Sequence, residues 1–79
     1  MKLTVKLSTT LRDHVPDYVP ETGLQAEMPE GSTVAQLAQH LGLPLQDIKI
    51  VMVNGRQHKV DDPMRDGDRI AYFPAVGGG

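Results

Sequence analysis

The residues that could do chemistry gather at the end of the chain, which reads FPAVGGG. Glycine has no side chain to bury and loses more freedom on ordering than any other residue, so Gly77, Gly78 and Gly79 cannot serve a hydrophobic core. A glycine backbone can, however, come close to a phosphate without a Cβ in the way. Pro74 cannot donate a ladder hydrogen bond, so we expect it to end the last strand. The ending predicts a flexible tail, residues 75–79, that buries little and has no partner strand.

No other group of polar residues has the spacing of a catalytic or metal site. Four aspartates gather in residues 61–68, but they lack the alternating oxygen ligands and the distal Glu of a calcium loop. His14, His40 and His58 have no spacing typical of a metal site or a catalytic triad. We therefore expect no metal, although the acidic stretch can steer a basic partner surface by long-range attraction.

The composition argues against several classes of protein. Its 79 residues suffice for one small domain. A net charge of −2 argues against a nucleic-acid binder, which needs a basic face. The absence of cysteine excludes disulfides, thiolate nucleophiles and cysteine-based zinc sites. No apolar run is long enough for a membrane span or a signal peptide, so we expect a cytoplasmic protein that has no membrane contact.

Hydrophobic periodicity predicts one helix and several short strands. Val34, Leu37, Ala38 and Leu41 form the apolar stripe of an amphipathic helix. Ser32 is the expected N-cap of this helix, and a capping box from Thr33 to Gln36 is the weaker alternative. At the other end, Gly42 is expected at the C′ position. Strands are expected at 2–7, 24–28, 48–53, 56–60 and 69–73, with an Asn54-Gly55 turn between the third and the fourth.

These elements predict an α+β domain, residues 1–74, in which a mixed sheet of four or five strands packs on one main helix. The first and last strands are expected side by side in the middle of the sheet, which is the β-grasp arrangement. The expected core residues are Leu3, Val5, Leu37, Leu41, Val51 and Ile70.

Two large apolar residues are expected on the face of the sheet that the helix does not cover. Alternation along the third strand places Met52 there, opposite in direction to Val51 and Val53. The same alternation places Phe73 there, because Ile70 would face the helix. Two such residues close to the tail predict a docking patch.

The residues considered so far resemble the MoaD/ThiS family of ubiquitin-like sulfur carriers, which end in Gly-Gly. The resemblance rests on PEGSTVAQLAQHLGLP, VMVNGR and DGDRIAYFPAVGGG, and it covers essentially the whole chain. It is closer to the MoaD type, the small subunit of molybdopterin synthase, in the long connection of residues 8–23 and in FPAV, where that type has F-P-P-V. Ala75 at the second proline position and the triple glycine depart toward the ThiS type.

The resemblance implies a chemistry for the tail. An E1-like adenylating enzyme of the MoeB/ThiF type would use ATP to adenylate the carboxylate of Gly79, and sulfur would then replace the adenylate to give a thiocarboxylate. The sulfur would serve molybdopterin synthesis for a molybdenum or tungsten cofactor, in a larger synthase subunit of the MoaE type. The partners would contact Phe73, Met52, Pro74 and Val76. The chain would be a co-substrate or a small non-catalytic subunit with no permanently bound cofactor.

Other roles use the same fold and ending. A ThiS-like carrier would supply sulfur to a thiazole synthase for thiamine, and related carriers serve cysteine or secondary metabolites. A ubiquitin-like protein modifier shares the activation step but joins its tail to lysines of other proteins. An RNA-associated TGS-type module is disfavoured by the net charge and by the glycine tail. The receiving pathway and the sulfur donor therefore stay open.

Overall fold

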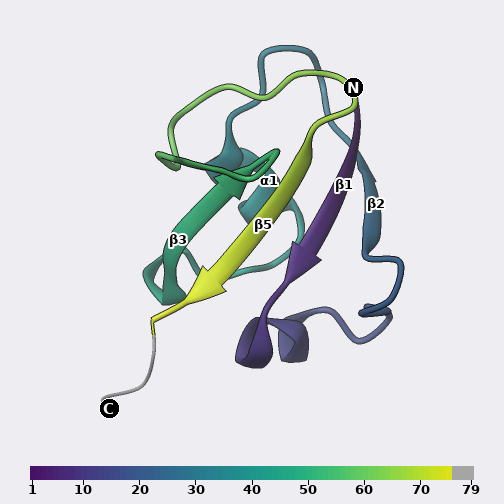
Figure 1. Cartoon of the computed structure of the whole chain (residues 1–79), viewed down its shortest axis with the longest axis vertical. Helices are drawn as coiled ribbons and strands as arrows, with labels where there is room; N and C mark the ends of the chain where they lie inside the picture. Colours follow the sequence, from purple (N-terminus) through teal and green to yellow (C-terminus); the bar gives the residue numbers. More distant parts are fainter. Residues whose placement is uncertain (76–79) are drawn as a thin grey trace.

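A computed structural model describes residues 1–75 of the chain, apart from the side chain of Thr9. It contains a five-stranded mixed sheet in the order β2-β1-β5-β3-β4, and in Figure 1 the α-helix α1 lies behind this sheet. The strands are β1 (Lys2–Leu7), β2 (Leu24–Glu27), β3 (Ile48–Val53), β4 (Arg56–His58) and β5 (Arg69–Pro74). The helices are α1 (Val34–His40) and the 3₁₀ segments η1 (Thr9–His14) and η2 (Leu45–Asp47). The predicted β-grasp arrangement is confirmed.

The first and last strands form the centre of the sheet, as expected. β1 and β5 run parallel, with Val5 opposite Ile70 and Leu7 opposite Tyr72. All four side chains are buried, because alternate residues of each strand point toward α1. The remaining residues of β1 and β5 therefore point to the opposite face, which we call the open face.

The hairpin between β3 and β4 follows from its two turn residues. Asn54 and Gly55 both have positive φ angles, 52° and 83°, which is the backbone of a type I′ turn and the reason for the Asn-Gly preference there. The strands pair antiparallel from Val53 opposite Arg56. The predicted turn is confirmed.

The N-terminus of α1 differs from the prediction by one residue. Thr33, not Ser32, is the N-cap, and its hydroxyl accepts a hydrogen bond from the Gln36 N–H at 3.2 Å. The Gln36 side chain in turn accepts from the Thr33 N–H at 2.8 Å, which completes a capping box. The Ser32 hydroxyl is buried and donates to the carbonyl of Pro29 at 2.7 Å. Ser32 is therefore used to close the preceding turn and cannot cap the helix.

The C-terminus of α1 closes as predicted. Gly42 has a φ angle of +79°, its N–H bonds to the Gln39 carbonyl, and the Leu43 N–H bonds back to Ala38. This pair of bonds is the Schellman motif, which places glycine at C′ because a Cβ is disfavoured in the left-handed conformation.

The core lies between α1 and the sheet. Five of the six expected core residues are buried, and the sixth, Leu41, is partly buried and packs against them. The connections supply further buried residues that periodicity did not predict, namely Leu11, Leu43 and Met64.

The long connection of residues 8–23 is fastened to the end of β1 by two side chains. The Leu7 N–H donates to the hydroxyl of Tyr18 at 2.9 Å, and Arg12 Nε donates to the Leu7 carbonyl at 2.9 Å. The Arg12 guanidinium lies 5.7 Å from the centre of the Tyr18 ring, within the range of a cation–π contact. The connection is thus held beside the end of the sheet at which β5 finishes.

A buried tyrosine joins β5 to α1 and gives a first prediction. The Tyr72 side chain is 0% exposed, and its hydroxyl donates to the Val34 carbonyl at 2.7 Å. Tyr72→Phe keeps the ring but removes this bond, so we expect the free energy of unfolding to fall by about 1 kcal/mol. Urea unfolding at neutral pH measures this loss.

The pH dependence provides the control for this prediction. Burial raises the pKa of the Tyr72 phenol above its ordinary 10.0, so the folded state keeps a proton that the unfolded state loses. This contribution to stability is complete below pH 10.0 and is lost as the pH rises toward the folded-state pKa. The difference in stability between wild type and Tyr72→Phe should therefore narrow in alkali. A difference independent of pH would contradict a buried, protonated phenol.

Candidate functional site

The root of the tail lies at the end of β5. Pro74 pairs with Ile48 in the register of the sheet, and the Ala75 N–H still donates to the Asp47 carbonyl at 3.3 Å. One backbone bond is therefore made beyond the proline, where the prediction had the tail begin at Ala75. Val76 and the three predicted tail glycines lie outside the described residues.

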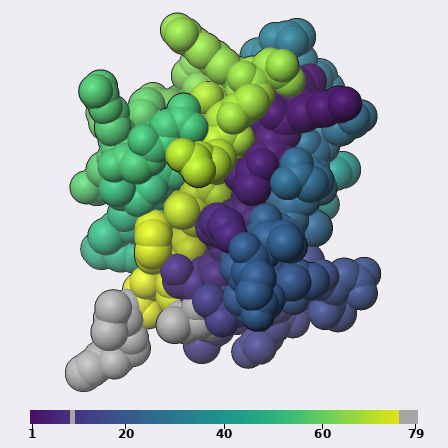
Figure 2. Space-filling view, turned by 45° about the vertical axis from the view of Figure 1, so that its right-hand side comes forward, coloured from purple at the N-terminus to yellow at the C-terminus, as the bar shows by residue number. Residues whose placement is uncertain are grey.

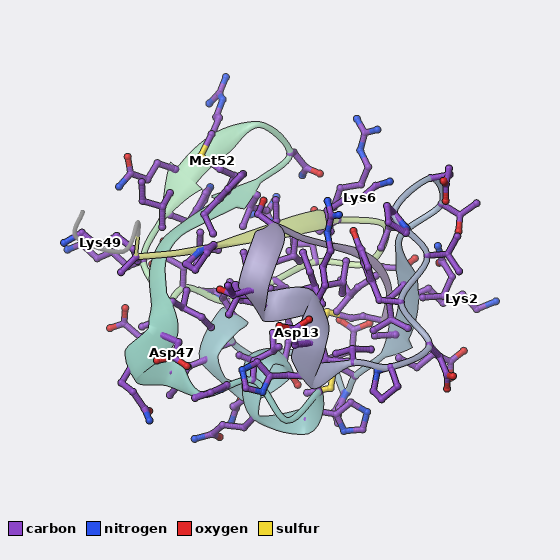
Figure 3. All side chains as sticks on the ribbon, turned by 90° about the horizontal axis from the view of Figure 1, so that it is seen from below. Lys2, Lys6, Asp13, Asp47, Lys49 and Met52 are labelled. Atoms are coloured by element: carbon purple, nitrogen blue, oxygen red, sulfur yellow. The ribbon has the colours of Figure 1, made fainter. Side chains whose placement is uncertain are left out.

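An apolar patch lies on the open face directly beside this root. Phe73 is 36% exposed and pairs in register with Ile50, which is 38% exposed. Half-buried Met52 pairs with half-buried Ala71 one step further from the tail. We call these four residues the docking patch. Figure 3 shows Met52 on the side of the sheet away from η1.

Met52 and Phe73 thus lie on the face predicted from alternation, and their role in binding a partner stays a prediction. Ile50 was not predicted as part of the patch. The signal for it was present, because Ile50 lies two residues before Met52 on the same strand and must share its face. The pairing of β3 with β5 has a register shift between Ile48 and Ile50.

A shallow depression of about 340 Å³ opens on the same face. Lys6 and Arg69 border it, and the apolar part of its lining includes Met52, Ala71 and Phe73. The surface is hollowed here because Ala71 has a small side chain between the longer ones of Lys6 in β1 and Met52 in β3. The patch is therefore a surface suited to a protein partner and not an enclosed pocket for a small molecule.

A second depression, of about 660 Å³, lies at the start of β5 and is lined by polar residues. Asp62 is one of these, and its carboxylate accepts bonds from the Lys59 N–H and the His58 ring, both at 3.0 Å. These hydrogen bonds lower the pKa of Asp62, and the bond from the Lys59 N–H has the largest effect. The Asp68 carboxylate similarly accepts from Asn54 Nδ2 and the Arg65 N–H. Asp62 and Asp68 thus each accept a bond from the backbone N–H three residues earlier, which closes a turn.

Candidate metal ligands do not converge in the described part of the chain. Within residues 1–75, no group of three or more His, Cys, Asp or Glu side chains could hold a metal ion. His14 pairs weakly with Asp47 at 4.0 Å, and His40 lies in the last turn of α1. No helix among the described residues is long and apolar enough to cross a membrane.

The comparisons with known proteins identify the family. The family model described as Mut7-C ubiquitin matches residues 1–77, which include the whole sheet, α1 and the root of the tail. The chain belongs to the Mut7-C ubiquitin family. The prediction of a ubiquitin-like family is therefore confirmed. No curated protein matches the sequence.

Solved structures share the fold of this ubiquitin-like domain. One is a putative molybdopterin converting factor subunit 1 from Pyrococcus furiosus, with 23% identity, a TM-score of 0.73 and coverage of 96% of this chain and 99% of that one. Another is the small archaeal modifier protein 1 of Haloferax volcanii, with 19% identity, a TM-score of 0.74 and coverage of 95% and 98%.

A third solved structure shows the fold in an assembly. In the complex of subunits 1 and 2 of the molybdopterin-converting factor from Helicobacter pylori, the matching chain is 18% identical, with a TM-score of 0.62 and full coverage of both chains. At such identities the likeness extends to the fold of the ubiquitin-like domain. It includes proteins of the molybdopterin type to which the sequence resemblance pointed.

Proposed function

We propose that this domain is a sulfur carrier, with Gly79 as the carboxyl terminus of the functional chain. An oxygen of the Gly79 carboxylate attacks the α-phosphorus of ATP on an E1-like adenylating enzyme, and pyrophosphate leaves. A sulfur nucleophile at the oxidation level of sulfide then attacks the carbonyl carbon, and AMP leaves. The product is a C-terminal thiocarboxylate. The domain is a co-substrate in this reaction, and ATP binds to the adenylating enzyme. Because the reaction consumes ATP, we place it in the cytoplasm.

The observation that carries the proposal is the position of the docking patch at the root of the glycine tail. Phe73 is the last open-face residue of β5 before Pro74, and it lies next to exposed Ile50. Five residues follow Pro74, and an extended chain of that length spans at most about 18 Å. A partner that binds the docking patch would therefore receive the Gly79 carboxylate within about 18 Å of Pro74, in a channel that glycines can enter.

We further propose that the sulfur is delivered to molybdopterin, for a molybdenum or tungsten cofactor. The solved structures support this choice because two of the proteins that share the fold are subunits of molybdopterin-converting factors. In one of them the small subunit is seen in a complex with subunit 2. By analogy, a larger synthase subunit would take the tail of this domain after activation.

A second candidate function is protein modification. The fold is shared with a small archaeal modifier protein, and a modifier would be activated at Gly79 in the same way. The two functions differ in the acceptor, which is a biosynthetic intermediate for a carrier and a lysine for a modifier. A carrier for thiamine thiazole synthesis is distinguished from both by its need for a thiazole synthase.

The test measures the mass of the intact chain. The purified protein is incubated with the E1-like adenylating enzyme of the same genome, ATP and sulfide. We expect the mass to rise by the difference between one sulfur and one oxygen atom, with the change confined to the C-terminal peptide. Omission of ATP is the control. An unchanged mass would reject the carrier function, and a ladder of conjugates in cell extract would favour the modifier.

A further inference from the structure

The docking patch is bordered by positive charge. Lys6 and Arg69 both line the open-face depression, and its lining contains no Asp or Glu from the described part of the chain. Lys6 lies opposite Ala71 in the register of β1 and β5, and Arg69 begins β5 on the same face. Figure 2 shows the side chains of β1, in purple, beside those of β5, in yellow, on the outer surface of the molecule.

Within residues 1–75, the cations beside the docking patch have no partner of opposite charge. Among residues 1–75, no Asp or Glu oxygen lies within 4.0 Å of the charged nitrogens of Lys6, Lys49 or Arg69, since the ion pairs there involve histidines. The Lys6 ammonium donates to the carbonyls of Pro20 and Glu21 at 3.2 and 3.4 Å. These bonds hold Lys6 in place without neutralising its charge, so the charge remains available to a partner.

Lys49 adds a third cation close to the tail. It is exposed and lies in the register shift of β3, between Ile48, which pairs with Pro74, and Ile50, which pairs with Phe73. Figure 3 shows Lys49 beside the end of β5. The positive groups therefore lie on two sides of the docking patch.

The carboxylates of residues 1–75 lie outside the lining of the open-face depression, although the chain has a net charge of −2. The acidic stretch of residues 61–68 ends directly before Arg69, at the end of β5 opposite Pro74. Its last residue, Asp68, accepts a hydrogen bond from Asn54 in the lining of the depression. Asp13 and Asp47 lie on the helix side of the sheet (Figure 3). Among residues 1–75, Lys6 and Arg69 are therefore the charged residues that line the open-face depression, and Lys49 lies next to the end of β5.

We propose that the docking patch binds a protein partner whose contact surface is an apolar recess bordered by Asp and Glu side chains. Phe73 and Ile50 would enter the recess, while Arg69, Lys6 and Lys49 would face the carboxylates. The inference rests on the proposed function and names the chemistry of the partner that receives the tail. Apolar centres with a charged rim are the usual anatomy of such interfaces. The expectation that the acidic stretch attracts a basic partner does not apply to this face.

Charge reversal tests the inference on the full-length chain. Binding of the E1-like adenylating enzyme is titrated by calorimetry with wild type, Arg69→Glu, Lys6→Glu and the double variant. We expect each single variant to raise Kd by at least about 10-fold in ~0.05 M salt, because a repulsive pair replaces an attractive one. The effect should shrink in ~0.5 M salt, where the Debye length is only about 4 Å.

Lys59→Glu is the matched control, because it makes the same change in net charge. Lys59 is exposed and lies after β4. The carbonyl of the next residue, Val60, bonds to the start of α1, so Lys59 lies away from the open face. Its Kd should stay within about 2-fold of wild type, since distant surface charges are screened. Arg69 is the cleaner variant, since its side chain makes no hydrogen bond within residues 1–75. A melting curve for each variant verifies that it is folded.

The outcomes separate the inference from the proposed function. Weaker binding by Arg69→Glu and Lys6→Glu, with Lys59→Glu unchanged, supports an acidic recess. If the wild-type tail gains sulfur but the reversed variants bind equally well or more tightly, the inference is overturned and the carrier function stands. If the wild type neither binds the enzyme nor gains sulfur, the carrier function fails and the inference fails with it.

Discussion

Deletion of Gly79, or addition of one residue after it, is expected to abolish formation of the thiocarboxylate. The activated group in the proposed reaction is the carboxylate of Gly79, so a different last residue moves the reactive carbon by about 3.5 Å along the tail. Such a displacement is large compared with the tolerance of an attacking group. Intact-mass spectrometry after incubation with the adenylating enzyme, ATP and sulfide measures the loss.

The stability of the domain should not change in these variants. The buried apolar residues of the described chain end at Tyr72, and the last strand ends at Pro74. Urea unfolding should therefore give the wild-type midpoint. The extended variant also provides a reversal, because removal of an added C-terminal lysine by a carboxypeptidase should restore the reaction. Normal sulfur transfer to the extended chain would contradict the carrier mechanism.

Local patterns were sufficient to predict the main elements of the fold. The alternation of KLTVKL reflects one buried face, the Asn54-Gly55 turn reflects backbone angles that few residues adopt, and Gly42 ends a helix for the same reason. The choice between Ser32 and Thr33 as the N-cap could not be made in this way. Both carry hydroxyls, and only the burial of Ser32 against Pro29 decides between them.

Core residues in the connections were hidden for a related reason. Leu11 and Met64 are buried but lie in segments whose sequence has no helical or strand periodicity. No pattern in the neighbouring residues therefore indicates that their side chains pack in the core. Their burial depends on where residues 8–23 and 59–68 lie across the fold, which is a tertiary property.

The candidate site also has features that local patterns predict and features that depend on the tertiary structure. Phe73 and Met52 were placed on the open face by alternation within their own strands. Alternation along the first strand also puts Lys6 on this face, but the residue that Lys6 lies beside depends on the register between strands. Lys6 lies beside the patch only because β1 pairs with β5 so that Lys6 is opposite Ala71. A shift of one residue would turn the Lys6 side chain to the other face. Long-range pairing, which local sequence does not encode, therefore decides which charged residues lie next to the docking patch.

The second large effect separates binding from folding. Phe73→Ala removes a side chain that is 36% exposed, so we expect the free energy of unfolding to change by no more than about 1 kcal/mol. Affinity for the adenylating enzyme should nevertheless fall by about 2 kcal/mol or more, because an aromatic residue at the centre of an interface is a typical anchor. Titration calorimetry and urea unfolding on the same preparation measure both quantities.

Leu37→Ala should show the reverse. Leu37 is 0% exposed on the buried face of α1, so truncation should cost about 2–5 kcal/mol of stability through lost burial and a residual cavity. Its affinity, measured where the variant is still folded, should match wild type because Leu37 does not reach the surface.

Val19→Ala completes the comparison with Phe73→Ala. Val19 is 46% exposed in the long connection, outside the docking patch, so neither its stability nor its affinity should change appreciably. If Phe73→Ala instead lowered stability as much as Leu37→Ala and left affinity unchanged, Phe73 would be a packing residue and the docking patch would have no role. Because Phe73 directly precedes Pro74 at the root of the tail, loss of its contact should also slow sulfur transfer to Gly79 when the enzyme is below saturation. Saturating enzyme should restore the rate, since the variant keeps the whole glycine tail.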